Sequence, residues 1–221
     1  MENSLDKSKK EWDEVYQDNG DNLSWTKPQH LIESLNNIRK HLQQRRKPIE
    51  SMLDYGCGTA ELAVALKRIM GVNNVVATDI TDKAVNKKYL DLNGIKFQIA
   101  SRPNEVRTDQ KFDLIICNHV FNHIDPRFHT EYLIGFKNLL SENGSLILTG
   151  FSDKSKFFGG KEEVSVKGQN RKVYSMKNLD NKDVFKDVGL DVKASEEVER
   201  EGTGTVLKNF VLNNQGDEKE V

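Results

Sequence analysis

The chain has 221 residues, which suits one domain of ordinary size and is short for two. Lys and Arg number 33 and Asp and Glu number 34, so the formal net charge is −1 although 30% of the residues are charged. This balance disfavours a protein that binds nucleic acid through bulk electrostatic attraction. No apolar run approaches the roughly 20 residues of a membrane span, and the polar residues 1–10 do not resemble a signal peptide. We therefore expect a soluble, cytoplasmic protein with one core.

Two cysteines, Cys57 and Cys117, form neither a disulfide framework nor a paired set of metal ligands. No other group of His, Cys, Asp or Glu has the spacing of a metal site, a catalytic triad or a carboxylate pair. We expect reduced thiols and no bound metal.

The first 150 residues alternate between helical and extended patterns. The apolar residues Leu31, Leu35, Ile38 and Leu42 recur at helical spacing after Pro28, and Leu62, Leu66 and Ile69 share one face of the next predicted helix. The predicted helices are 28–47, 59–70, 81–92 and 126–140, and the predicted strands are 51–55, 74–78, 95–100, 112–117 and 145–149, the last after an Asn143-Gly144 turn. This order predicts a parallel sheet covered by helices.

The remaining residues have a different pattern. Residues 151–177 contain seven Lys or Arg and three Asp or Glu. Two short extended segments, 164–166 and 172–175, flank a turn at 168–170 and predict a hairpin. A last helix at 178–188, strands at 190–198 and 206–213 and a disordered polar tail at 214–221 complete the prediction.

The most informative stretch is the glycine turn after the first predicted strand. Gly56 and Gly58 lie where a buried strand turns into a helix, so the backbone can approach a nucleotide-like ligand closely. A dinucleotide fingerprint would place its third glycine at Glu61, which disfavours NAD and FAD. The phosphate-binding loop pattern also fails, because no Gly-Lys-Ser/Thr follows the turn.

The stretch Asp54-Tyr55-Gly56-Cys57-Gly58-Thr59-Ala60 resembles the first motif of the class I S-adenosylmethionine-dependent methyltransferases, (D/E)xGxGxG, with alanine in the third glycine position. Residues 75–80, 112–124 and 139–148 are similar to three further motifs of that family, in the family's order. The resemblance covers residues 50–150. It implies an α/β, Rossmann-like fold with a seven-stranded, mostly parallel sheet, an antiparallel last strand and helices on both faces.

The resemblance implies S-adenosylmethionine as the cofactor. Asp54 would hold the amino group of its methionine part, Asp79 would accept from both ribose hydroxyls, and Ile80 would pack on the adenine. Asp79 as a helix cap and Ile80 as a core residue are the alternatives. The remaining predicted cofactor contacts are Gly56, Cys57, Gly58, Ser101 and Asn118. The family commonly has an acidic residue at the position of Ser101, where it contacts the adenine amino group. Ser101 could make a hydrogen bond there or be an ordinary loop residue, and the sequence favours neither.

The first residues have their own pattern. Residues 12–16 begin with Trp12 and end with Tyr16, and residues 24–28 contain Trp25 and Pro28. They are similar to the start of some small class I methyltransferases, in which an N-terminal helix lies over the cofactor. This resemblance implies a helical cap or lid at 1–45, with Tyr16 and Trp25 touching the cofactor, before a methyltransferase domain at 46–213. The alternative is that the aromatic residues only attach the helix to the domain.

Methyl transfer from a sulfonium mainly requires alignment of the acceptor and exclusion of water, with a general base only where the acceptor must lose a proton. His119, just beyond the fourth predicted strand, and His123 are the catalytic candidates, with His129 a weaker one. Each could instead be a histidine that serves packing alone.

The acceptor is the least determined feature. Residues 118–121, Asn-His-Val-Phe, do not match the (D/N/S)-P-P-(Y/F) motif of amino-directed nucleic-acid methyltransferases, and Cys117 lacks the Pro-Cys context of cytosine-carbon enzymes. We expect methyl transfer to an O or N atom of a small molecule, bound in a pocket over the fourth and fifth strands. The basic segment 151–177 would suit an acidic substrate or be a solvated loop. A protein lysine acceptor in an open acidic groove and a non-catalytic cofactor-binding subunit are the alternatives. The oligomeric state stays open.

Overall fold

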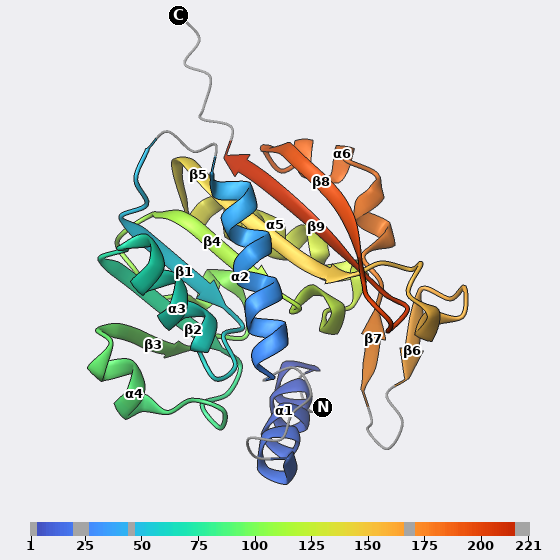
Figure 1. The fold of residues 1–221 in the computed structure, drawn as a ribbon, viewed down its shortest axis with the longest axis horizontal. Helices are drawn as coiled ribbons and strands as arrows, with labels where there is room; N and C mark the ends of the chain where they lie inside the picture. Colours follow the sequence, from blue (N-terminus) through green and yellow to red (C-terminus); the bar gives the residue numbers. More distant parts are fainter. Residues whose placement is uncertain (1–3, 20–26, 44–46, 166–170, 215–221) are drawn as a thin grey trace, which may run out of the picture. The chain divides into compact units, whose positions relative to one another are not determined.

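The computed structural model describes residues 4–19, 27–43, 47–165 and 171–214. Trp25 and residues 215–221 of the predicted tail lie outside these ranges, whereas Asn214, predicted as the first residue of the tail, ends a strand. The chain divides into two compact units, residues 1–109 and 110–221. Its main sheet has seven strands, mostly parallel, with an antiparallel last strand (Figure 1), which confirms the expected fold class.

The strands of the first unit match the predicted ones closely. β1 (Ser51–Tyr55), β2 (Asn74–Asp79) and β3 (Ile95–Ile99) are parallel, in the spatial order β3-β2-β1. Every residue of β1 is buried, as a strand covered on both faces requires. Because parallel strands end at the same edge, the carboxyl ends of β1 and β2 bring Asp54 and Asp79 to one edge of this sheet.

The helices of the first unit are α1 (Ser4–Asn19), α2 (Pro28–Leu42), α3 (Glu61–Met70) and α4 (Lys87–Leu92), with the short 3-10 helix η3 (Pro103–Glu105). α2 begins at Pro28 as predicted and packs on α3. α3 buries Ala63, Val64 and Leu66. Ile69 is 52% exposed, so the predicted apolar face is wrong at that residue.

α4 is much shorter than the predicted helix 81–92. The side chain of Asn86 accepts a hydrogen bond from the Tyr89 N–H at 3.0 Å and begins the helix there. The preceding residues instead form a turn in which the Thr81 hydroxyl accepts from the Lys83 N–H at 3.2 Å. Helix-compatible composition over 81–86 was therefore outweighed by local side-chain hydrogen bonds to the backbone.

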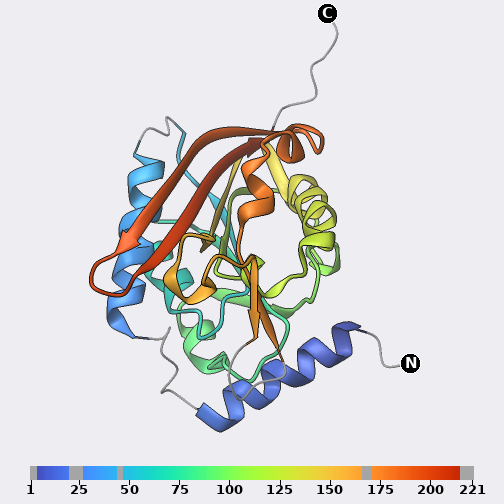
Figure 2. The ribbon, with the colours of Figure 1, turned by 90° about the vertical axis from the view of Figure 1, so that its right-hand side faces the viewer.

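The second unit carries the other four strands of the sheet. β4 (Phe112–Asn118) and β5 (Leu140–Phe151) are parallel, and β9 (Thr205–Asn214) is antiparallel to β5 and to β8 (Leu190–Arg200). Figure 2 shows β8 and β9 as a long two-stranded ribbon. The two strands of the predicted hairpin are confirmed as the antiparallel pair β6 (Glu163–Ser165) and β7 (Lys172–Tyr174), while the predicted turn at 168–170 lies outside the described residues.

The helices of this unit are shorter than predicted. The predicted helix 126–140 begins as the 3-10 helix η5 (Pro126–Phe128) and continues as α5 (His129–Leu139). The predicted helix 178–188 is divided into η7 (Lys177–Asp180) and α6 (Asp183–Lys186), because Asn181 has an extended backbone that ends η7 and its side chain accepts from the Asp183 N–H in a local turn. Two more 3-10 helices, η4 (Phe121–His123) and η6 (Lys156–Phe158), follow β4 and β5.

The predicted Asn143-Gly144 turn lies within β5, which starts earlier than expected. A Cβ atom on Gly144 would lie 2.7 Å from the Phe112 carbonyl oxygen, so the glycine permits a close approach between β5 and β4. Among the described residues, no helix is long and apolar enough to cross a membrane.

Candidate functional site

The glycine turn after β1 uses its own backbone donors internally. The N–H groups of Gly56 and Cys57 both donate to the Thr78 carbonyl oxygen at 2.8 Å, and the Gly58 N–H donates to Asp79 Oδ2 at 2.9 Å. Gly56 and Gly58 have φ angles of 73° and 53°, which glycine adopts without strain. A phosphate-binding turn needs N–H groups directed at the ligand, so this turn does not fit a pyrophosphate.

Asp79 lies at the end of β2 and is 6% exposed. Its Oδ2 accepts from Gly58, and its Oδ1 accepts from the Thr81 N–H at 3.3 Å. Burial raises the pKa of Asp79 to about 6, against the opposing effect of these backbone donors. A carboxylate has about four lone-pair sites, so Asp79 can accept further donors while it holds the turn.

Asp54, on β1, is 2% exposed. Unlike Asp79, it does not have, among the described residues, a hydrogen-bond donor on each carboxyl oxygen. One backbone donor, the Ala63 N–H, reaches the carboxyl, while Oδ2 is buried with no hydrogen-bond partner among the described residues. Burial, together with the nearby charge of Asp79, raises the pKa of Asp54 to about 7. A buried acceptor without a donor carries an energetic cost, so the site suits a ligand that brings a cationic donor.

The residue in the third glycine position has the backbone of a glycine. Ala60 has a φ of 61° and is fully buried immediately before α3. The left-handed conformation costs an alanine about 1 kcal/mol relative to glycine. The family motif usually has glycine here because the turn requires a positive φ. In this chain Ala60 adopts that φ at the cost of backbone strain.

The helix α1 is attached near the same turn. The Thr81 hydroxyl donates a hydrogen bond to Asp13, which also accepts from Lys9 Nζ at 2.8 Å. The ring of Tyr16 stacks on that of Trp12 with centroids 5.6 Å apart. The Tyr16 hydroxyl lies 3.5 Å from the position that a Cβ on Gly58 would occupy. Tyr16 and Gly58, 42 positions apart, are thus neighbours, as the predicted cap over the turn requires.

The other predicted cofactor residues of this unit are less distinctive. Ile80 is half-buried beside Asp79. The N–H groups of Ser101 and Arg102 donate to Glu105 Oε2 at 2.7 and 3.2 Å, so the acidic residue near this loop is Glu105. Sequence reasoning missed Glu105, although an acid six residues after the end of β3 was the available signal. Burial and the two aspartates raise the pKa of the Cys57 thiol, which keeps it neutral.

In the second unit, His119 is strained at the position expected for a substrate-side residue. It directly follows β4, its φ is 60°, and its N–H donates to the Thr149 carbonyl oxygen at 2.7 Å. Non-glycine residues in this conformation are uncommon and concentrate at functional sites.

The His119 ring begins an aromatic row, defined as His119, Phe151 and Phe157. Ring centroids lie 5.0 Å apart for His119 and Phe151 and 5.1 Å apart for Phe151 and Phe157. Phe157 is 45% exposed, which leaves aromatic surface open to a ligand. The two phenylalanines were not among the predicted site residues, because only the pairing of β4 with β5 brings the end of β5 beside His119.

The other two histidines and Asn118 have separate environments. Burial, with the positive charge of Arg171 second, lowers the pKa of His123 to about 3, so this ring is neutral at ordinary pH. His129 Nε2 bonds the Ile124 carbonyl oxygen at 3.0 Å and its Nδ1 bonds Asn178 Nδ2 at 3.0 Å, which indicates a packing role. Asn118 is the last residue of β4. Over the described part of the chain, no cluster of His, Cys, Asp or Glu could hold a metal ion.

The chain resembles curated proteins over part of their length. A ribosomal protein L11 methyltransferase from Caldicellulosiruptor saccharolyticus is 32% identical over 111 residues, which are 49% of this chain and 35% of that protein. The ribosomal protein L11 methyltransferase of Thermotoga neapolitana is 28% identical over 131 residues, which are 58% of this chain and 47% of that protein. The chain thus spans less than half the length of each of these two relatives.

Solved structures resemble this chain over nearly all of it. A Burkholderia thailandensis 1,6-didemethyltoxoflavin-N1-methyltransferase, with 1,6-didemethyltoxoflavin and S-adenosylhomocysteine bound, has a TM-score of 0.71 at 16% identity and covers 96% of this chain and 88% of its own. The magnesium protoporphyrin IX methyltransferase of Synechocystis PCC 6803, with S-adenosylhomocysteine bound, has a TM-score of 0.65 at 18% identity and covers 94% of each chain.

A family model described as a methyltransferase domain matches residues 27–193, most of the chain. The match includes the glycine turn, Asp79 and the β4 segment that carried the resemblance in the sequence. The chain therefore belongs to the methyltransferase domain family and has the Rossmann-like fold of the class I S-adenosylmethionine-dependent methyltransferases.

Proposed function

We propose that this protein transfers a methyl group from S-adenosylmethionine to an O or N atom of a small-molecule acceptor by in-line displacement. Family membership supports the reaction class. The observation that carries the acceptor assignment is the aromatic row, because its open ring surface suits a small, planar or apolar group.

The cofactor is assigned to the turn after β1. Asp54 Oδ2 accepts from the ammonium of the methionine part, since no donor among the described residues reaches this buried oxygen. Asp79 accepts from the ribose hydroxyls with the lone pairs that Gly58 and Thr81 leave open. Gly56, Cys57 and Gly58 provide room for the nucleoside, and Ile80 packs on the adenine. When bound, S-adenosylmethionine supplies a methyl group that is already activated on a sulfonium.

The helix α1 acts as a cap on the cofactor, with Tyr16 beside the turn. The hydrogen bond between Thr81 and Asp13 supports this assignment because it attaches α1 two residues after Asp79. Such a cap excludes water from a reaction in which water would compete for the methyl group.

His119 is the acceptor-side residue. Its ring belongs to the aromatic row, and its left-handed backbone is of the kind that concentrates at functional sites. It orients the acceptor and takes its proton where the acceptor must lose one. His123 is assigned to packing. Its pKa of about 3 means that the ring accepts a proton only weakly, which makes it a poor general base.

A protein acceptor is the second candidate, because the curated relatives are named ribosomal protein L11 methyltransferases. A small molecule is favoured by the aromatic row and by structural neighbours whose names refer to small acceptors, 1,6-didemethyltoxoflavin and magnesium protoporphyrin IX. A cofactor-binding subunit without catalysis is the third candidate.

One labelling experiment separates these candidates. The protein and S-adenosylmethionine with a tritiated methyl group are incubated with a fractionated lysate, and label is measured in metabolites, protein and RNA. We expect label in the metabolite fraction, and none with Asp79→Ala. Label in protein would establish the second candidate. Binding of S-adenosylmethionine by calorimetry without any transfer would establish the third, and absence of binding would refute the cofactor assignment.

A further inference from the structure

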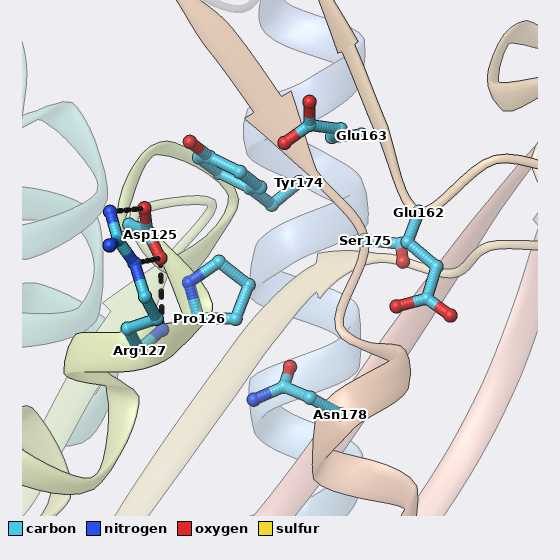
Figure 3. A pocket seen from close by; sticks show the side chains of 8 residues that line it. All are labelled: Asp125, Pro126, Arg127, Glu162, Glu163, Tyr174, Ser175 and Asn178. Atoms are coloured by element: carbon cyan, nitrogen blue, oxygen red, sulfur yellow. Dashed lines mark hydrogen bonds and ion pairs between the residues drawn. The ribbon is translucent and has the colours of Figure 1, made fainter.

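A cavity of about 280 Å³ lies in the second unit, between the 3-10 helix η5 and the β6–β7 hairpin with the start of η7 (Figure 3). Its lining is polar, and its members with titratable or hydrogen-bonding side chains are Asp125, Arg127, Glu162, Glu163, Tyr174, Ser175 and Asn178. None of these residues belongs to the aromatic row or to the cofactor turn. The cavity is therefore a site that the proposed function has not used.

The lining of the cavity contains three acidic side chains and one basic side chain. Arg127 is the one cation among the lining residues, and it is paired with Asp125, with Nη2 2.7 Å from Oδ2 and Nε 3.0 Å from Oδ1. The lysines of the basic segment are not in the lining: Lys172 pairs with Glu163 at 2.7 Å and Lys177 with Glu162 at 3.3 Å. All four of these side chains are about half exposed or more, and such pairs are weak. A ligand cation can therefore replace the lysines at little cost.

Ser175 is a buried polar group of the lining whose hydroxyl has no hydrogen-bond partner among the described residues. This serine is 3% exposed. Its backbone is held firmly, since its N–H donates to the Glu162 carbonyl oxygen at 2.7 Å. A hydroxyl that is closed to water and unpaired is costly, so a partner entering the cavity would be favoured.

Asn178 provides a second unpaired oxygen, and His129 fixes its orientation. His129 Nε2 must carry a proton, because it faces a carbonyl oxygen, and burial lowers the pKa of this ring and keeps it neutral. Its Nδ1 is then an acceptor, so the Asn178 amide must present its NH₂ group to it. Asn178 Oδ1 is thereby directed away from His129, and it is buried without a partner in the described part of the chain.

We propose that this cavity binds an alkylammonium group of the methyl acceptor. The lining offers acceptors on several sides, namely the oxygens of Ser175, Asn178, Glu162 and Glu163 and the Tyr174 hydroxyl, whereas its one cation is already paired. An ammonium brings three N–H donors and a positive charge, which matches that set. This inference rests on the proposed function for the identity of the ligand as the acceptor.

The cavity is connected to the aromatic row through Asn122, which is fully buried in η4. Asn122 Nδ2 donates to the Tyr174 carbonyl oxygen at 2.6 Å, and its Oδ1 accepts from the Phe151 N–H at 3.0 Å. The Met176 N–H also donates to the Phe151 carbonyl oxygen at 2.9 Å. One buried amide thus links the backbone of a cavity-lining residue to the backbone of a member of the row.

The test measures binding without requiring methyl transfer. The full-length protein, loaded with S-adenosylhomocysteine, is titrated with phenethylamine, with its neutral counterpart phenethyl alcohol, and with Nα-acetyl-lysine methylamide, and binding is followed by ¹H–¹⁵N NMR. We expect phenethylamine to bind at least about tenfold more tightly than the alcohol, the size of one charge-assisted hydrogen bond. Preference for the lysine amide over phenethylamine would indicate an ammonium from a protein, and would overturn the small-molecule acceptor but not the cavity.

Variants locate the binding. The double variant Glu162→Gln/Glu163→Gln should weaken phenethylamine about tenfold and Ser175→Ala about threefold, whereas Glu199→Gln, on exposed β8, should change nothing. Equal affinity for amine and alcohol, no binding of any amine, or unchanged affinity in both cavity variants would overturn the proposal. Formation of S-adenosylhomocysteine from S-adenosylmethionine is measured separately: amine binding without turnover leaves the ammonium site intact and refutes the acceptor assignment.

Discussion

The two units of the chain build their functional residues in opposite ways. In residues 1–109, the candidate site is one turn and two strand ends, and the key groups are backbone N–H donors and two aspartates within 26 positions of one another. In residues 110–221, the aromatic row and the cavity draw on β4, β5, η5, η6 and the β6–β7 hairpin. A ligand common to a family can be held by a short, recurring motif, whereas an acceptor specific to one protein is held by loops that vary.

The sharpest test of this contrast is His119. If His119 acts on the acceptor, His119→Ala should reduce methyl transfer at least about 100-fold, the usual scale of a lost general acid–base group, with the affinity for S-adenosylhomocysteine unchanged. Turnover and calorimetric binding are measured on the same preparation. His30→Ala, on α2, provides the matched control. Unchanged turnover in His119→Ala would remove His119 from the acceptor site.

Asp79 tests the opposite unit. Asp79→Asn removes the charge that accepts from Gly58 and Thr81, and we expect the dissociation constant for S-adenosylhomocysteine to rise about 30-fold, as for loss of charged hydrogen bonds. Calorimetry measures this constant. Asp91→Asn, an exposed acid of α4, should leave it within twofold, about the scatter expected of a surface substitution. Equal effects of the two substitutions would contradict the assignment of Asp79.

The raised pKa of Asp54 predicts how the stability of the folded protein depends on pH. Its pKa is about 7 in the folded protein and 3.8 ordinarily, so the folded state holds a proton between these values that the unfolded state has lost. The folding free energy is therefore more favourable near pH 4 and becomes less favourable as the pH rises through about 7. Asp79, with a pKa of about 6, contributes in the same direction. His123 acts in the opposite direction, because its pKa is lowered from 6.5 to about 3, so between these values the unfolded state holds a proton that the folded state lacks and the contribution of His123 to stability rises with pH.

A cationic ligand requires the ionised carboxyl. We expect the affinity for S-adenosylmethionine to fall by up to about tenfold for each pH unit below 7, with proton release on binding. Calorimetry in buffers of different ionisation enthalpy measures the number of protons released. Asp54→Asn should bind weakly and lose this pH dependence. A flat affinity between pH 5.5 and 8 in the unaltered protein would refute the role of Asp54.

The smallest expected effects come from alanine substitutions at two glycines. These substitutions distinguish a loss of stability caused by backbone strain from a loss of cofactor binding. Gly58 and Gly71 both have positive φ, 53° and 68°, so alanine at either should lower the free energy of unfolding by about 1 kcal/mol. Only at Gly58 would the new Cβ meet another group, the Tyr16 hydroxyl at 3.5 Å, whereas nothing lies within 4 Å at Gly71. That contact is an ordinary van der Waals distance. Because Gly58 belongs to the turn assigned to the cofactor and Gly71 caps the far end of α3, Gly58→Ala should also weaken S-adenosylhomocysteine binding, while Gly71→Ala should not. Denaturant unfolding and calorimetry measure the two quantities.

The predictions that were right rest on local, strong patterns. β1, β2 and β4 are continuous apolar runs bounded by turn residues, and the structure places each within a residue or two of its predicted bounds. The helices predicted at 81–92 and 178–188 lacked a repeating apolar face. Asn86 begins a shorter helix in the first, and the extended Asn181 interrupts the second. Local side-chain hydrogen bonds to the backbone are hard to foresee from composition, because the same residues are compatible with a helix.

The segment 151–177 shows that the net charge of a segment does not predict which of its charged side chains line a binding site. Its excess of lysines and arginines favoured an acidic substrate or a solvated loop, yet Glu162 and Glu163 line the cavity while Lys172 and Lys177 pair from outside its lining. Which side chains face a cavity depends on how the hairpin pairs and where η5 and η7 pack, and long flexible lysines readily extend toward water.

By itself, the sequence determined the family, the order of strands and helices, and the glycine turn with Asp54 and Asp79, because these depend on apolar periodicity and on residues close together in the chain. Only the tertiary structure decided that Asp54 keeps an unpaired oxygen, that Ala60 and His119 adopt left-handed backbones, and that Ser175 and Asn178 share a cavity with Asp125. Burial, backbone strain and unpaired polar atoms arise from contacts between distant segments, and no local pattern of residues records them.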